Sequence, residues 1–227
     1  MLTTLRNFAL QVLIVLCVYA LPLFLPAGIQ AWPAAWIFLI LWFGFWGSIL
    51  LWLSRHNPPL FHERLRVSAP DQKGWDRIFG MLINLVLFGW LLFIAFDVTR
   101  WHWSPVPAWL QMAGGAIVLF SFYIFYRTFR ENTFLSPLVR IQGERGQTVI
   151  SSGPYHYVRH PMYAATTVFI LGAPLLLGAW LGLLPGLLFV LVLARRAVLE
   201  EATLRRELPG YAAYKDEVKY RLVPFIW

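Results

Sequence analysis

Long apolar runs alternate with short polar segments along most of the chain. Residues 5–25, 32–53, 78–96 and 108–126 form four such runs. Runs of about 20 residues suit a hydrocarbon core roughly 30 Å thick, because a helix rises about 1.5 Å per residue and satisfies its own backbone hydrogen bonds. The pattern therefore predicts four transmembrane helices.

A fifth apolar run, residues 162–194, is too long for one crossing. Gly178, Gly182, Pro185 and Gly186 interrupt it, and glycine and proline are typical of turns. We therefore expect two short helices folded into a hairpin. The predicted fold is an all-α, polytopic transmembrane bundle with about six crossings, followed by a helical C-terminal tail on the cytoplasmic side.

The composition agrees with a membrane protein. Hydrophobic residues make up 59% of the chain and charged residues 13%, whereas soluble domains carry roughly 25% charged residues. The first run could be mistaken for a cleaved secretion signal. Its apolar core is long, however, and no small-residue cleavage pattern follows before Trp32, so we expect it to be retained.

Positive charge gathers on one face of this predicted topology. Of the 19 Lys and Arg residues, all but Arg100 fall at Arg6 or within residues 55–77, 127–159 and 195–221. Loops rich in Lys and Arg tend to stay in the cytoplasm, which places both termini there. We expect an integral protein of the plasma or inner membrane rather than of an organelle. The net charge of +8 then reflects topology and attraction to anionic membrane lipids rather than nucleic-acid binding.

The connections between the runs differ in length. Residues 26–31 and 97–107 are short outer connections, whereas the cytoplasmic segments are long and polar. We therefore expect the functional residues on the cytoplasmic face of the membrane. Residues 55–77 contain two turn-forming sequences, which favour an interfacial loop that contacts lipid headgroups. Cys17, the only cysteine, lies within the first crossing. It excludes an internal disulfide and a cysteine metal cluster, and packing is its expected role.

A first polar block, Ser-Ser-Gly-Pro-Tyr-His-Tyr-Val-Arg-His-Pro-Met-Tyr, occupies residues 151–163. Pro161 suits the first turn of a helix, which leaves His160 at the capping position. The N–H groups at this helix start could receive a ligand carboxylate. His156 and His160 are four residues apart, but a zinc site needs further ligands, so no metal is expected. Taken alone, either histidine is more typical of a helix cap or a headgroup contact.

A second polar block, Arg-Arg-Ala-Val-Leu-Glu-Glu-Ala-Thr-Leu-Arg-Arg, follows the hairpin at residues 195–206. Helical spacing predicts ion pairs of Arg196 with Glu200 and of Glu201 with Arg205. Two interpretations stay open. The block could be a solvated helix that extends out of the membrane, or a partly buried Arg196 or Glu200 at the bilayer surface could require a partner or a ligand.

The two blocks together resemble the isoprenylcysteine carboxyl methyltransferase-like family, and phospholipid N-methyltransferases share a related pattern. The resemblance rests on Gly153-Pro154-Tyr155, Val158-Arg159-His160-Pro161-Met162-Tyr163, Arg196, Glu200-Glu201, Tyr211, Tyr214 and Arg221-Leu222-Val223-Pro224. It covers roughly residues 120–227, whereas the first half carries no comparable motif. We therefore divide the chain into N-terminal helices of unassigned role, residues 1–110, and a methyltransferase-like core, residues 111–227.

The resemblance implies S-adenosylmethionine as the methyl donor, bound at the cytoplasmic face between the first block and the tail. The implied cofactor-binding residues are Tyr155, His156, Val158, Arg159, His160, Pro161, Tyr163, Glu200, Glu201, Tyr211 and Tyr214. The implied catalytic residues are Arg196, which would orient the acceptor, and Glu200, which would fix Arg196 or the cofactor. Ala165 stands where the family often has glycine, so slightly altered packing is expected there.

The implied reaction transfers a methyl group to a lipophilic acceptor that arrives sideways from the bilayer. A carboxylate acceptor needs no base, whereas a protonated amine or a thiol must first lose a proton, with His156, His160 or Glu200 as candidate bases. A prenylated cysteine, a phospholipid amine, an isoprenoid acid and a small thiol all stay open as acceptors.

Two other classes of protein fit parts of the pattern. Membrane reductases of the sterol and steroid type have a related His-Pro-x-Tyr turn and would bind NADPH, but Met162 sits where they tend to carry Asn, and the Glu200-Glu201 pair favours the methyltransferase. A non-enzymatic, lipid-binding membrane protein would need only the basic face. It would leave the two polar blocks without a purpose.

Overall fold

The structure is a computed structural model that describes residues 10–28 and 32–227, and within them it is helical with no strand. Residues 10–15 are helical and lead into η1. The elements are η1 (Leu16–Ala20), α2 (Leu21–Ala27), α3 (Pro33–His56), α4 (Pro58–Arg64), α5 (Gly74–Phe96), η2 (Asp97–Trp101), α6 (Ala108–Glu131), η3 (Gly143–Arg145), η4 (Gly153–His156), α7 (Pro161–Leu177), η5 (Trp180–Gly182), α8 (Leu183–Glu207) and α9 (Tyr211–Glu217). The all-α bundle predicted from the sequence is confirmed.

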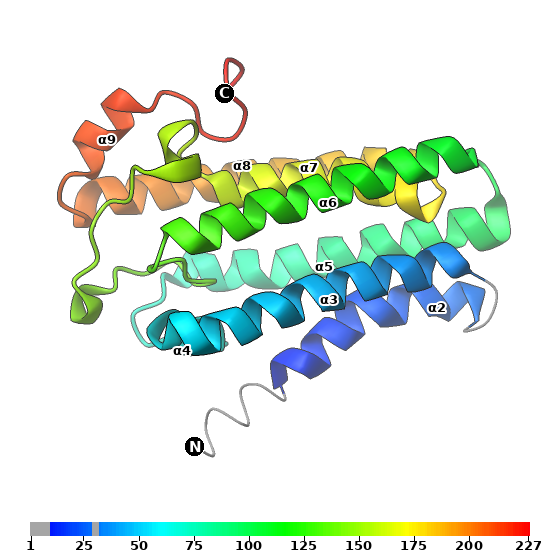
Figure 1. The fold of residues 1–227 in the computed structure, drawn as a ribbon, viewed down its shortest axis with the longest axis horizontal. Coiled ribbons are helices and arrows are strands. Elements are labelled where there is room, and N and C mark those ends of the chain that lie inside the picture. Colours follow the sequence, from blue (N-terminus) through cyan, green and yellow to red (C-terminus); the bar gives the residue numbers. More distant parts are fainter. Residues whose placement is uncertain (1–9, 29–31) are drawn as a thin grey trace.

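The long helices lie side by side and alternate in direction (Figure 1). Helix α4, residues 132–160 and helix α9 gather at one end of the bundle, which we call the site end. There the Lys73 ammonium lies 2.8 Å from the Glu207 carboxylate. At the opposite end the Trp32 indole N–H donates to the Leu177 carbonyl over 3.1 Å. The long polar connections are therefore all at the site end.

Four helical segments are long and apolar enough to cross a membrane: Pro33–His56, Gly74–Trp101, Ala108–Glu131 and Trp180–Glu207. Two shorter apolar helices, Leu10–Pro26 and Pro161–Leu177, run with them. Large apolar side chains are exposed on the outside of the bundle, where lipid would cover them; Met112, for example, is 71% exposed. The count of six crossings and the cytoplasmic placement of the termini stay predictions, and Arg6 lies outside the described residues.

The predicted hairpin is present, but its second helix is not short. Helix α7 ends at Gly178, whose φ of +101° favours glycine. Pro185 and Gly186 lie inside α8, which runs for 25 residues. Pro185 is tolerated because it falls in the first turn, where backbone N–H groups have no helical acceptor. Helix α8 therefore carries the second polar block out of the apolar region without a break.

The outer connection predicted at residues 97–107 begins as helix, because α5 continues through η2. Asp97 is buried, and its carboxylate accepts the backbone N–H groups of Trp103 and Ser104 at 2.8 and 3.2 Å. The carboxylate thus closes the turn that follows the helix. Cys17 is exposed, so the packing role predicted for it inside the bundle is wrong.

Helices α6 and α7 approach each other closely at two glycines. A Cβ atom on Gly114 would lie 2.5 Å from the Leu176 backbone nitrogen, and one on Gly172 would lie 2.8 Å from the Gly114 carbonyl oxygen. Small residues let transmembrane helices pack backbone to backbone. This contact fixes α6 against α7, the helix that begins with the last three residues of the first polar block.

Candidate functional site

The first polar block and the tail lie against each other at the site end. Helix α7 begins at Pro161 with His160 as its N-cap, as predicted. The backbone N–H of His160 donates to the Arg221 carbonyl over 2.9 Å. The Tyr214 hydroxyl donates to the Tyr155 carbonyl over 2.7 Å. Residues that are about 60 positions apart in the sequence are therefore joined by direct hydrogen bonds.

A buried carboxylate holds this junction together. Glu201 lies 2.7 Å from Nε of Arg159, 3.3 Å from Nε2 of His160 and 3.0 Å from Nε of Arg221. Its side chain is only 6% exposed. The ion pair predicted between Glu201 and Arg205 is therefore wrong. Helical spacing makes Arg205 a neighbour, but Glu201 faces the first polar block and Arg205 points to the surface.

Arg196 is held by Asp76, a residue of the N-terminal half. Its Nε and Nη2 donate to Oδ1 of Asp76 over 3.0 and 2.7 Å, and Nη2 also donates to the Pro137 carbonyl over 3.0 Å. Its Nη1 donates to the Tyr163 hydroxyl, which in turn donates to Glu200 over 2.7 Å. The predicted Arg196–Glu200 ion pair is therefore wrong, because Tyr163 bridges the two residues and Asp76 is the partner of the guanidinium.

One cavity of about 710 Å³ opens among these groups. Its polar part is lined by the predicted residues Tyr155, Arg159, His160, Pro161, Tyr163, Arg196, Glu200, Tyr211 and Tyr214. Three other predicted residues are not part of its lining. His156 is exposed, Val158 is buried beneath the turn, and Glu201 is engaged in the junction. Their roles toward a cofactor stay predictions.

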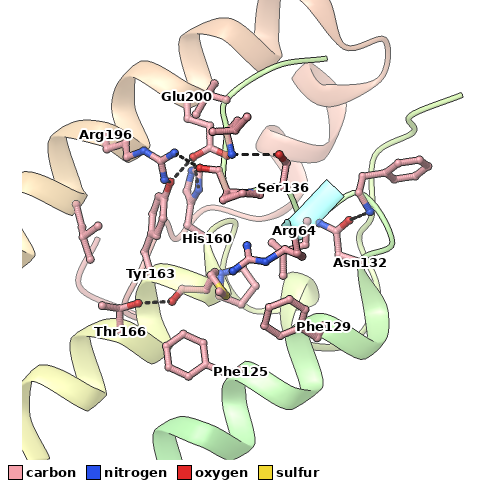
Figure 2. Close-up of a pocket in the computed structure, with 18 of the residues that line it drawn as sticks. Arg64, Phe125, Phe129, Asn132, Ser136, His160, Tyr163, Thr166, Arg196 and Glu200 are labelled. Carbon is pink, nitrogen blue, oxygen red and sulfur yellow. Dashed lines mark hydrogen bonds and ion pairs between the residues drawn. The ribbon is translucent and has the colours of Figure 1, made fainter. Parts of the chain in front are cut away.

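The same cavity continues into the apolar interior of the bundle. That part is lined by Val12, Val15, Tyr19, Trp42, Phe43, Trp46, Phe125, Phe129 and Phe169, among others. Figure 2 shows Phe125 and Phe129 of α6 on the side of the cavity away from Arg196 and Glu200. The cavity is therefore amphipathic: polar at the site end and apolar toward the centre of the bundle.

A second ion-pair cluster, centred on the buried pair of Arg140 and Glu63, supports residues 134–142, which line the cavity between α6 and η3. Arg140 donates to both carboxylate oxygens of Glu63, over 3.0 and 2.9 Å, and also reaches Asp71 at 2.9 Å and Glu144 at 2.6 Å. Burial by itself raises the pKa of Glu63, but hydrogen bonds from Arg140 and Ser136 outweigh burial and hold the pKa below its ordinary value. Glu63 therefore stays ionised and joins α4 to Ser136 and Arg140 in the connection between α6 and η3.

Sequence reasoning missed the contribution of residues 55–77. It interpreted them as an interfacial loop, yet Glu63 and Asp76 are 2% and 1% exposed. Both bind arginines far along the chain, and no local pattern indicates such pairings. The only signal in the sequence was the presence of three acidic residues, Glu63, Asp71 and Asp76, in a segment otherwise interpreted as a basic interfacial loop.

The tyrosines of the polar part are neutral donors. Burial raises the pKa values of Tyr155, Tyr211 and Tyr214. The Tyr155 hydroxyl accepts a hydrogen bond from the Asn132 amide over 2.7 Å.

Within residues 10–28 and 32–227, no group of three or more His, Cys, Asp or Glu side chains could hold a metal ion.

Comparison with known protein families gives a match to the second half of the chain. Residues 109–209, from the start of α6 to the end of α8, match the phospholipid methyltransferase family. No curated protein matches the chain. The matched segment includes both polar blocks, whereas Asp76 and Glu63 lie before it. With its long apolar helices, the chain is thus an integral membrane protein whose residues 109–209 match the phospholipid methyltransferase family, in agreement with the resemblance predicted from the two blocks.

Proposed function

We propose that this protein transfers a methyl group from S-adenosylmethionine to a lipophilic acceptor at the inner surface of a cell membrane. The observation that carries the proposal is the continuous amphipathic cavity, in which the polar groups of both family blocks adjoin an apolar space inside the bundle. A soluble donor and a lipid-like acceptor need such adjoining compartments. The family match supports the reaction class.

The polar part of the cavity fits the proposed donor chemically. S-adenosylmethionine supplies an activated methyl group on a positively charged sulfonium, and it also carries an ammonium and an adenosine. Glu200 presents a carboxylate that, among the described residues, accepts a hydrogen bond only from Tyr163. The buried Tyr211 hydroxyl has no hydrogen-bond partner in the described residues. We expect Tyr155, His160, Glu200 and Tyr211 to hold the donor.

The chain's own residues would act mainly by positioning and by excluding water. Asp76 and Tyr163 fix the Arg196 guanidinium at the wall of the cavity. Correct alignment of two reactants supplies a large part of the acceleration in such transfers. An amine acceptor must lose a proton, and Glu200 and His160 are the candidate bases because both line the cavity. Oε2 of Glu200 lies 3.9 Å from Nδ1 of His160.

The proposed orientation places the site end and both termini in the cytoplasm, where the donor is found. The support is the concentration of Lys and Arg at that end. The N-terminal helices then have a role that the sequence left unassigned, since Trp42, Trp46 and Asp76 line the cavity or hold a residue that lines it. The division at residue 110 is therefore a boundary of sequence similarity in this proposal, and the working site includes both parts.

Calorimetric titration of the protein in detergent with S-adenosylhomocysteine, the demethylated product, tests the proposal. We expect binding by the wild type and weaker binding by Glu200→Gln and Tyr211→Phe. Glu207→Gln is the matched control, because Glu207 lies on the same helix but pairs with Lys73 outside the cavity. Binding of NADPH without any heat from S-adenosylhomocysteine would favour the reductase instead. Transfer of labelled methyl groups from S-adenosylmethionine into a lipid extract would identify the acceptor.

A further inference from the structure

One arginine in the cavity has no anionic partner. Arg64, at the end of α4, lines the cavity between the polar group at Tyr163 and the ring of Phe129 (Figure 2). Its guanidinium lies 5.0 Å from the centre of the Phe129 ring and 5.9 Å from that of Trp46. Within the part of the chain that the structure describes, no carboxylate lies within 4.0 Å of this guanidinium, and no group accepts a hydrogen bond from it.

Other buried arginines at the site end differ from Arg64 in this respect. Arg140, Arg159 and Arg196 each form an ion pair with a carboxylate that is almost completely buried: Glu63, Glu201 and Asp76. Their charges are neutralised inside the protein. Arg64 therefore contributes net positive charge to the cavity wall.

The surroundings of Arg64 disfavour its charge. Burial, together with repulsion from Arg196, outweighs the attraction of the neighbouring Glu63 and lowers the pKa of Arg64 to about 10. The guanidinium is still protonated at neutral pH, so it remains a cation whose N–H groups have no acceptor among the described residues, at the border of the apolar part of the cavity. An uncompensated cation in such a place lowers stability. A ligand anion would remove that cost, and cavities that bind anions commonly use arginine because its planar donors match carboxylate and phosphate oxygens.

We propose that Arg64 binds an oxyanion, a phosphate or a carboxylate, that the methyl acceptor carries next to its apolar chain. This inference rests on the proposed function and defines its substrate class: an amphipathic acid whose tail lies among Trp42, Trp46 and the first helix.

The neighbours of Arg64 assign this oxyanion to the acceptor rather than to the donor. Phe129 and Trp46 begin the apolar part of the cavity, which continues along α3 toward Trp42 and Val15. The groups proposed to hold the donor, such as Tyr211, belong to the polar part. The indole N–H of Trp46 also lacks a hydrogen-bond acceptor in the described residues.

Arg196 completes the arrangement from the other side. Asp76, Pro137 and Tyr163 engage its N–H groups except for one on Nη1. An oxyanion between Arg64 and Arg196 would relieve the repulsion between the two guanidinia. Arg64 would supply the attraction, while Arg196 would supply direction through that remaining N–H.

The experiment measures ligand binding by four proteins in detergent: the wild type, Arg64→Gln, Arg64→Lys and Arg55→Gln. Arg55→Gln is the matched control, because it removes one charge from the same end of the bundle at an exposed residue outside the cavity. The phosphate probe is dioctanoyl phosphatidylethanolamine, compared with dioctanoylglycerol. The carboxylate probe is N-acetyl-S-farnesylcysteine, compared with its methyl ester. S-adenosylhomocysteine reports on the donor site.

We expect the wild type to bind one of the two oxyanion-bearing probes more tightly than its counterpart without the oxyanion, and the probe that binds identifies the oxyanion. Arg64→Gln should weaken that binding at least about tenfold, the loss typical of a hydrogen bond to a charged group, and Arg64→Lys should weaken it less. Binding of S-adenosylhomocysteine should not change. The melting temperature of Arg64→Gln should equal or exceed that of the wild type, because the substitution removes an uncompensated charge; a purely structural residue would lower it.

Three outcomes would overturn the inference: binding of neither oxyanion-bearing probe to the wild type, equal binding of that probe by wild type and Arg64→Gln, or loss of S-adenosylhomocysteine binding alone in Arg64→Gln. The last outcome would assign the anion to the donor. Failure of the wild type to bind S-adenosylhomocysteine or to transfer methyl groups would refute the proposed function, and the probe titrations would still report separately on Arg64.

Discussion

Replacement of Asp76 with Asn tests whether the N-terminal helices hold Arg196, the arginine that the proposed function places at the wall of the cavity. Asp76 accepts two hydrogen bonds from Arg196 on one oxygen, and the backbone N–H of Val139 and the side chain of Gln72 on the other, at 2.8 and 2.9 Å. The amide of Asn keeps the shape but loses the charge, and its NH₂ group would face two donors. The Asp76 side chain is 1% exposed, so water cannot replace the lost carboxylate as the partner of Arg196.

The expected cost follows from this geometry. Removing one member of a buried ion pair costs roughly 3–5 kcal/mol, and we expect Asp76→Asn to lie near ~3 kcal/mol because it keeps part of the hydrogen bonding. Methyl transfer should fall by more than the loss of folded protein explains, because Arg196 loses the partner that fixes its direction.

Unfolding in mixed micelles by titration with dodecyl sulfate, followed by circular dichroism, measures this cost. A double-mutant cycle with Arg196→Met isolates the pair, and we expect a coupling of about 2 kcal/mol or more. Costs that add to within about 0.5 kcal/mol, or a single-variant cost below about 1 kcal/mol, would refute the reasoning. Glu207→Gln, which breaks an exposed pair with Lys73, should change stability by less than about 1 kcal/mol.

Two further predictions concern packing and pH. Gly114→Val should destabilise the bundle by about 1–3 kcal/mol, because its Cβ would meet the Leu176 backbone at 2.5 Å; Gly115→Val, whose Cβ would lie 3.6 Å from the tip of the Leu176 side chain, should cost less in the same titration. The pKa of Glu63 is lower folded than unfolded, since hydrogen bonds from Arg140 outweigh burial. The contribution of Glu63 to the free energy of unfolding should be complete above the unfolded pKa of about 4.3, and it should be lost as the pH falls through the folded pKa. Glu63→Gln should flatten that decline; an unchanged pH profile would contradict it.

The sequence predicted the helices well where a physical pattern is local. Apolar runs located the membrane-spanning helices, and the expected start of α7 at Pro161 was confirmed because proline and the residue before it restrict the backbone directly. The predicted ends of the helices were less accurate than their positions. Helix α8 passes Pro185 without a break, since the effect of proline depends on its place within a helix.

The ion pairs were predicted from helical spacing, and there the prediction failed. Spacing identifies neighbours on one helix, so Arg196 was paired with Glu200 and Glu201 with Arg205. In the structure the partners are Asp76 for Arg196 and the residues of the first block for Glu201. Which buried carboxylate meets a buried guanidinium depends on which helix lies across the gap, and that information is absent from a local pattern.

The sequence by itself determined that this chain is a membrane-spanning helical bundle, that its charge gathers at one end, and that two polar blocks carry the family resemblance. Each of these properties depends on the order of residues within a helix or a turn. Only the tertiary structure decided that the N-terminal half completes the site through Asp76, that Glu201 joins the turn to the tail, and that Arg64 lines the cavity without a carboxylate partner in the described chain. The physical reason is that buried charges are balanced by contacts between helices, and those contacts exist only after the helices have packed.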